Sequence, residues 1–274
     1  MSDYDRNAVS AQFGQTMGRS GAIAVDEGLR AYMLRIYHYM VLGLAITGLA
    51  ALGIYMLSVT GEMSSAAKIV RSGAEVPARI AGNMYLTPLG YYFFLSPLKW
   101  VIMLAPLAMV FVLSFGIERM RPAVAQLTFW VFAALMGLSL GSIFIVFTHT
   151  SIVRVFFITA ASFGALSLWG YTTQRDLTGM GSFLLMGLFG VILASLVNLF
   201  MASSALQFAV SVVGVLVFAG LTAWDTQRLK AQYLYGAMDG EATDRSAIIG
   251  ALSLYLNFIN LFTLLLQLLG QREE

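Results

Sequence analysis

The feature that most constrains this sequence is a long segment without charge, since no Asp, Glu, Lys, Arg or His occurs from Leu177 to Trp224. A water-soluble domain cannot hide such a run, because soluble domains are about 25% charged overall. A membrane-spanning helix needs roughly 20 apolar residues, so the segment is long enough for two crossings. The polar cluster at residues 202–207 is the expected turn between them.

The rest of the chain has the same character, with 59% hydrophobic and 11% charged residues. Apolar runs bounded by charges or turn residues predict seven helical spans. A membrane β-barrel would show short alternating segments instead, so we expect an all-α integral membrane protein. The predicted spans are Tyr39–Val59, Trp100–Ile117, Ala123–Thr148, Val155–Tyr171, Gly181–Met201, Phe208–Trp224 and Ala247–Leu269.

The chain ends and loops predict its topology. Residues 1–30 are polar and lack the apolar core of a signal peptide, so we expect a disordered cytoplasmic tail. The transmembrane domain would cover residues 31–270, with a long loop at 60–99, and residues 271–274 would form a C-terminal tail. Lys and Arg are enriched in cytoplasmic loops. Placing the N-terminus in the cytoplasm puts ten of the 16 Lys and Arg residues there, which predicts a multi-pass inner-membrane protein with its C-terminus outside.

Several functional classes are excluded by what the sequence lacks. There is no Cys, which excludes disulfides, Cys-ligated zinc and thiol nucleophiles. The two histidines, His38 and His149, form no HExxH motif, and no Walker A motif occurs. A basic stripe with interleaved aromatic residues, typical of nucleic-acid binding, is also absent. We therefore expect neither an enzyme nor a resident cofactor, and no nucleic-acid partner.

Polar residues that could carry a function lie on single faces of the last two spans, at helical intervals of three and four. On the sixth span, Ser211, Thr222 and Asp225 share a face with Gly214 and Phe218, which gives a small and polar face that ends in a carboxylate. On the seventh span the polar residues are Ser253, Asn257, Asn260 and Gln267.

Polar groups at membrane depth usually face the bundle interior, because desolvation without a partner costs several kcal/mol. We therefore expect the two polar faces to meet, with Ser195 and Asn198 of the fifth span as further members. The structural alternatives are an interfacial ion pair from Asp225 to Arg228, at i and i+3, or to a loop arginine, and simple interhelical hydrogen bonding by the amides. Elsewhere, Gly137 and Gly141 form a GxxxG pattern that is typical of close helix packing.

The sequence resembles the Bax inhibitor-1 family, in its bacterial YccA/YetJ-like branch, over roughly residues 30 to 270. The segments that carry the resemblance are residues 163–173, 176–178, 218–227 and 251–262. The resemblance implies six helices around a central C-terminal seventh. It also implies a pH-sensitive calcium leak, gated by carboxylates on the sixth and seventh helices with an arginine partner. An alternative role that it implies is binding and modulation of an FtsH-type membrane protease.

Within this resemblance, Asp225 falls on the sixth-helix carboxylate, whereas the seventh-helix position, usually Asp, is Asn257. An Asp and an Asn carry one titratable proton between them, so a two-carboxylate sensor is incomplete. Arg119 or Arg121, at the end of the second span, could supply the arginine partner, and Glu118 another acid.

The resulting hypothesis is an ion pathway and pH sensor built from Asp225, Asn257, Asn260 and Ser253. Calcium, as the possible transported ion, prefers six to eight oxygen ligands, so Asp225 with the amides and water would form only a weak metal site. The expected partners are the lipid bilayer, calcium ions, protons and a membrane AAA protease.

Overall fold

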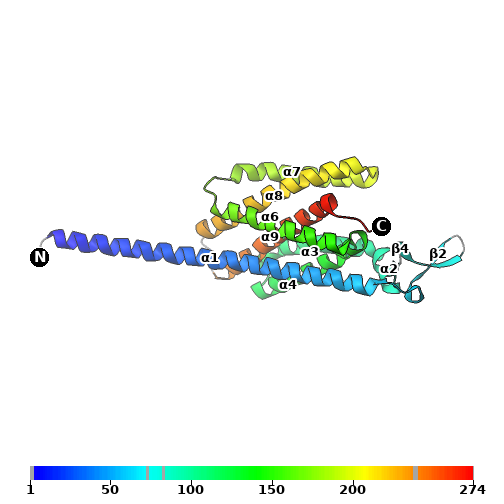
Figure 1. The fold of residues 1–274 in the computed structure, drawn as a ribbon. Coiled ribbons are helices and arrows are strands. Elements are labelled where there is room, and N and C mark those ends of the chain that lie inside the picture. Colours follow the sequence, from blue (N-terminus) through cyan, green and yellow to red (C-terminus); the bar gives the residue numbers. More distant parts are fainter. Residues whose placement is uncertain (1–2, 72–73, 82–83, 237–239, 274) are drawn as a thin grey trace.

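The structure is a computed structural model that describes residues 3–71, 74–81, 84–236 and 240–273 (Figure 1). It is 83% helical, and seven helices of the described chain are long and apolar enough to cross a membrane, as predicted. These helices are α1 (Asp3–Ser58), α3 (Leu98–Gly116), α4 (Pro122–Leu140), α6 (His149–Thr172), α7 (Thr178–Met201), α8 (Ser204–Tyr235) and α9 (Gly240–Leu269). Two short helices, η2 (Ile117–Arg119) and α5 (Ile143–Val146), extend α3 and α4 at their C-terminal ends.

Helix α9 is the centre of the bundle. In its most apolar stretch 61% of the residues are buried, against 17% to 39% in the other six helices. It packs against α8, α1, α6 and α4. Tyr255 is fully buried between Phe129 and Phe132 of α4, and its hydroxyl hydrogen-bonds with Thr47 of α1 at 2.7 Å. The predicted central position of the seventh helix is therefore confirmed, with four of the other six helices packed directly against it.

Helix α1 extends far beyond the bundle at its N-terminal end, as Figure 1 shows. Its membrane-spanning part begins at Glu27, but the helix itself begins at Asp3. Residues 3–30 are thus helical where the sequence predicts a disordered tail. No proline precedes Pro77, and a helix that is already nucleated by a long apolar span propagates easily into such a segment.

The loop at residues 60–99 contains short strands, which the all-helical prediction missed. Two antiparallel sheets form, with strand orders β1-β5-β4 and β2-β3. Their contacts bury Ala67, Ala78 and Leu86 in a small separate core. Runs of two to four residues are too short for an alternating pattern to stand out. The elements are β1 (Val59–Thr60), η1 (Met63–Ser65), β2 (Lys68–Arg71), β3 (Ala74–Pro77), β4 (Arg79–Ala81), β5 (Met84–Leu86) and α2 (Pro88–Phe94).

The turn expected at residues 202–207 is confirmed, since α7 ends at Met201 and α8 begins at Ser204. Ala202 adopts a left-handed conformation with φ of 49°, which costs a non-glycine residue about 1 to 2 kcal/mol. Side-chain hydrogen bonds offset this cost. Asn198 accepts from the Ser203 amide and donates to Gln207, both at 3.0 Å.

Helices α8 and α9 are longer at the α8–α9 connection than the apolar runs predict. The sixth span was expected to end at Trp224, but α8 continues to Tyr235, and α9 begins at Gly240 instead of Ala247. Asp225 therefore lies inside a helix, with more than two further turns after it. This extension sets the depth of the candidate site.

Candidate functional site

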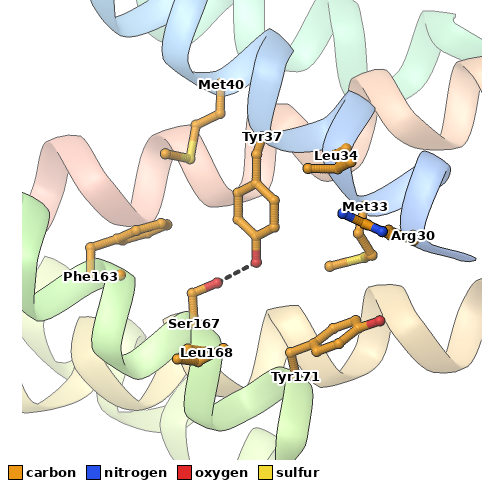
Figure 2. Close-up of a pocket in the computed structure, with 10 residues that line it drawn as sticks. Arg30, Met33, Leu34, Tyr37, Met40, Phe163, Ser167, Leu168 and Tyr171 are labelled. Carbon is orange, nitrogen blue, oxygen red and sulfur yellow. Dashed lines mark hydrogen bonds between the residues drawn. The ribbon is translucent and has the colours of Figure 1, made fainter.

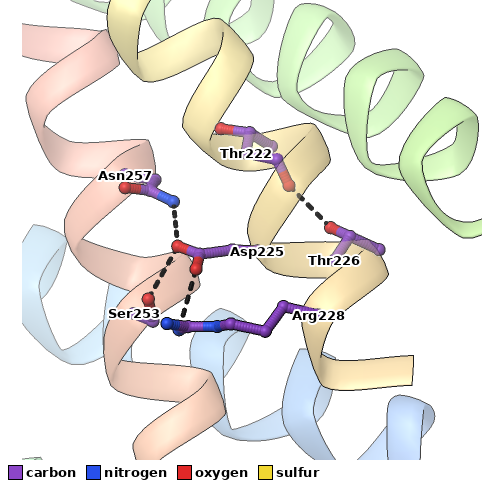
Figure 3. A network of polar contacts seen from close by, with 6 residues as sticks. All are labelled: Thr222, Asp225, Thr226, Arg228, Ser253 and Asn257. Atoms are coloured by element: carbon purple, nitrogen blue, oxygen red, sulfur yellow. Dashed lines mark hydrogen bonds and ion pairs between the residues drawn. The ribbon is translucent and has the colours of Figure 1, made fainter. Parts of the chain in front are cut away.

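The candidate site is built around the carboxylate of Asp225, which is 4% exposed on α8 (Figure 3). Its Oδ2 atom accepts two hydrogen bonds from α9, from Ser253 Oγ at 2.7 Å and from Asn257 Nδ2 at 2.8 Å. The spacing of these two donors, four residues apart, places them on one face of α9. The predicted meeting of the polar faces of the two helices is confirmed at this end.

The second carboxylate oxygen forms an ion pair within α8. Arg228 Nη2 lies 2.8 Å from Asp225 Oδ1, although the angle is not that of a hydrogen bond. The guanidinium also lies over the ring of Trp224, 4.8 Å from its centroid, and its side chain is 47% exposed. Arg228 thus joins a buried carboxylate to the helix surface. Asp225 therefore takes part both in the i, i+3 ion pair with Arg228 and in the hydrogen bonds between α8 and α9.

Behind this carboxylate, a chain of hydroxyl groups links three helices. Thr226 of α8 hydrogen-bonds with Ser167 of α6 at 2.9 Å, and Ser167 hydrogen-bonds with Tyr37 of α1. Thr226 also donates to the carbonyl oxygen of Thr222 (Figure 3). Tyr37 and Ser167 could not be predicted as members of this network from the sequence. A single hydroxyl in an apolar span gives no periodic signal.

Gln227 fixes the connection between α6 and α7. Its side chain donates to the Arg175 carbonyl at 2.7 Å and accepts from the Leu177 amide at 2.8 Å. In the same connection, hydrogen bonds from the side chain and backbone of Thr178 hold the pKa of the exposed Asp176 below its ordinary value. These contacts tie the ends of α6, α7 and α8 together beside the candidate site.

A second polar cluster, the outer amide cluster, lies at the opposite end of α8 and α9. Gln267 accepts from Gln207 at 2.6 Å and from Ser211 at 2.9 Å, and Gln207 in turn contacts Asn198. The predicted contact between the two polar faces is confirmed here as well. Ser195 only donates to the Val191 carbonyl of its own helix.

An apolar layer separates the outer amide cluster from Asp225. Phe218 and Leu221 of α8 and Leu261 of α9 are buried in one cluster of side chains. Ser211 precedes Asp225 by 14 residues, about 21 Å along a helix. The polar face predicted from spacing is therefore interrupted by buried apolar side chains.

Other predicted site residues lie elsewhere. Asn260 donates to the Leu256 carbonyl of its own helix at 2.8 Å, and so does not join the Asp225 network. Glu118 contributes only its backbone carbonyl, which accepts from Arg245 at 3.0 Å. Arg119 and Arg121 are exposed, and no contact in the described part of the chain joins either of them to Asp225.

The arginine beside Asp225 is instead Arg228. Arg228 lies on the same helix as Asp225, one turn away, and is therefore closer to the carboxylate than Arg119 or Arg121.

The oxygen atoms at the site come from one carboxylate, one hydroxyl and one amide. Among the described residues, no cluster of three or more His, Cys, Asp or Glu side chains could hold a metal ion. Calcium prefers six to eight oxygens, so any ion here would keep most of its water.

These features define a seven-helix membrane protein with a central helix and a buried carboxylate bridged to it. Residues 29–274 match the sequence profile of a family described as "Inhibitor of apoptosis-promoting Bax1". The chain belongs to this family, the Bax inhibitor-1 family.

Relatives from several bacteria match most of the chain. An uncharacterized protein of Rickettsia prowazekii is 42% identical over the full length of both chains. An uncharacterized protein of Caulobacter vibrioides is 41% identical over 92% of this chain and 93% of its own. The inner membrane protein YbhL of Escherichia coli K12 is 40% identical over 90% of this chain and 94% of its own. The E. coli relative supports a location in an inner membrane.

Proposed function

We propose that this protein is a passive, proton-modulated cation path, with calcium as the transported ion. The observation that carries the proposal is the buried Asp225 carboxylate, which bridges α8 to the central helix through Ser253 and Asn257. Ionisable groups at membrane depth are costly and usually serve ion or proton movement. The family resemblance supports the same function.

The contacts of Asp225 suggest how protonation would act. In the charged state, both oxygens attract donors, two from α9 and the guanidinium of Arg228. A proton on the carboxyl group would remove the ion pair and weaken the charge-assisted hydrogen bonds, which are roughly twice as strong as neutral ones. Loss of this latch would let α8 move away from α9 and would disturb the apolar layer.

A cation would find only weak coordination at this point of the path. Asp225, Ser253 and Asn257 together offer four side-chain oxygens, and Arg228 opposes the approach of a positive ion until it swings away. Weak, water-rich coordination suits passage better than storage, because an ion that binds tightly leaves slowly.

The test is calcium flux in proteoliposomes over a range of pH. The Asp225→Asn variant should lose the pH response, because an amide cannot titrate. Asp176→Asn, which makes the same change at an exposed carboxylate of the α6–α7 connection, is the matched control and should keep the pH response. If Asp225→Asn keeps both the flux and the pH response of the wild type, Asp225 is not the sensor and the proposal fails.

A second candidate function is regulation of a membrane AAA protease. The observation that favours it is the N-terminal part of α1, which projects beyond the other helices as a potential binding element (Figure 1). Deletion of residues 2–24 would remove this projection and leave the span from Glu27 intact. Protease binding should be lost while calcium flux is kept. Unchanged co-purification with the protease after this deletion would rule the projection out as its binding element.

A further inference from the structure

An open groove runs between α1 and α6 along the membrane depth, with α9 as its floor. It consists of three cavities of 570, 680 and 440 Å³. Adjacent cavities share lining residues, Met40 and Phe163 at one junction and Leu44 and Phe258 at the next. The three therefore form one continuous surface, which we call the α1–α6 groove.

The two ends of the groove differ in chemistry. Away from Arg30, its lining is almost wholly apolar. At the Arg30 end, Figure 2 shows the guanidinium group and the Tyr171 side chain at one end of the first cavity, and the hydrogen-bonded Tyr37 and Ser167 deeper within it. The Lys230 ammonium group lies 5.0 Å from the Tyr171 ring centroid. The groove is thus amphipathic along its length.

Arg30 is available to a ligand. It is exposed, and no ion pair in the described part of the chain uses it. Between Arg30 and Leu52 the groove follows 22 residues of α1, about 33 Å. The hydrocarbon core is about 30 Å thick, so the groove can hold a whole acyl chain in the part nearest Arg30, with the headgroup at the surface.

We propose that the α1–α6 groove binds one anionic phospholipid of the surrounding bilayer, with its phosphate at Arg30 and an acyl chain over Met40, Phe163 and Phe258. An apolar groove of this size does not retain water, and an unfilled one would forfeit dispersion contacts along its whole length. The acyl chain is the apolar partner that a bilayer supplies in excess. The cations at one end select a negative headgroup.

The groove also offers a way to test its occupancy without disturbing the fold. A side-chain carbon added at Gly164, which lines the first cavity, would meet no atom within 4 Å. The same holds for Gly190 on α7, which lies outside the groove. Gly164→Leu should therefore narrow the first cavity of the groove, and Gly190→Leu should only face lipid.

The experiment is native mass spectrometry of the detergent-solubilised full chain, titrated with dioleoylphosphatidylglycerol or dioleoylphosphatidylcholine. The wild type should bind one phosphatidylglycerol about fivefold more tightly than phosphatidylcholine, as expected for about 1 kcal/mol from one basic residue at a membrane surface. Arg30→Gln should abolish this preference, Gly164→Leu should remove the bound lipid, and Gly190→Leu should bind as the wild type does.

Three outcomes would overturn the proposal. The first is equal binding of the two lipids by the wild type. The second is undiminished phosphatidylglycerol binding by Gly164→Leu when its thermal unfolding matches the wild type. The third is a dimer mass that Gly164→Leu converts to monomer without loss of lipid, which would assign the groove to a second copy of the chain.

Discussion

At the scale of single residues, the charge of Asp225 is balanced by partners of unequal character. Ser253 and Asn257 come from the buried central helix, whereas Arg228 is half exposed and can exchange the carboxylate for water. The contacts from α9 therefore set where the carboxylate lies, and Arg228 is the partner that can leave.

Removal of the mobile partner should open the path at neutral pH. In Arg228→Gln, the carboxylate keeps its bonds to α9 but loses the positive charge that opposes an incoming cation. We expect a severalfold higher calcium flux at pH 7, measured in proteoliposomes. Arg175→Gln, which changes an exposed arginine of the α6–α7 connection, should leave the flux unchanged. Equal fluxes from the wild type and Arg228→Gln would contradict a latch.

A second carboxylate should sharpen the pH response. In Asn257→Asp, two carboxyl groups would meet where Asn257 Nδ2 now lies 2.8 Å from Asp225 Oδ2, and groups this close share a proton. We expect calcium flux to change over a narrower pH interval than in the wild type. The same change at Asn260, which bonds only to Leu256, should not have this effect. A pH profile as broad as that of the wild type would argue against coupling at this site.

Site residues could be predicted from the sequence only where polar residues recur at helical intervals. The intervals of three and four identified Asp225, Ser253 and Asn257 as one network. They also included Asn260, whose side chain turns to its own helix, because spacing defines a face and not a rotamer.

At the scale of helices, close packing in this bundle depends on glycines that face another backbone. Gly137 of α4 lies against α1, where an added side-chain carbon would be 2.4 Å from the Thr47 carbonyl oxygen and 2.7 Å from the Ala50 side chain. Its GxxxG partner, Gly141, lies in the same way against Ile54. The packing role predicted for this pattern is confirmed.

The α1–α4 contact should therefore not tolerate a methyl group. Gly137→Ala is expected to destabilise the protein by about 1 to 3 kcal/mol, because a backbone carbonyl cannot yield as a flexible side chain can. Gly48→Ala, on the opposing helix but with no atom within 4 Å of the new carbon, is the control. Thermal unfolding in detergent should show a lower Tm for the first variant only. Equal Tm values would contradict close packing here.

The apolar layer should act as the seal of the path. Leu261 is 1% exposed and lies between Asp225 and the outer amide cluster. Leu261→Ala leaves a cavity in this layer, which lowers the barrier to water and to ions, so calcium flux at pH 7 should rise severalfold. Leu216→Ala, which shortens a side chain that is 67% exposed to lipid, is the control. A rise of the same size in both variants would mean that general loosening, and not the seal, is responsible.

The number of helices and their membrane-spanning character could be predicted from the sequence, because each apolar run is long enough to cross the hydrocarbon core and only a helix satisfies its backbone groups there. The apolar layer that interrupts the polar faces of α8 and α9 could not be predicted from the sequence. It depends on which side chains of α8 and α9 interdigitate, and Phe218 and Leu261 carry no signal that separates a seal from ordinary core. The short strands were missed for a different reason, since they lie outside the spans where periodicity is informative.

At the scale of the whole molecule, the end of the bundle that holds Asp225 carries more Lys and Arg residues than the opposite end. Arg30, Arg175, Arg228 and Lys230 all lie at this end. The opposite end carries the strands of the loop at residues 60–99 and the C-terminal tail, which pairs with the start of α6 through Phe147 and Arg272. An odd number of spans places the two termini on opposite sides of the membrane.

Because Lys and Arg favour the cytoplasmic side, the Asp225 end should face the cytoplasm and the C-terminus the outside. Alkaline phosphatase fused after residue 274 should be active, since it folds only outside the cytoplasm, and green fluorescent protein fused there should be dark. The reverse pattern is expected for both reporters when they replace the chain after residue 120, in the α3–α4 connection. Active phosphatase at residue 120 with a fluorescent C-terminal fusion would invert the topology. Asp225 would then respond to the external pH, and the anionic lipid at Arg30 would belong to the outer leaflet.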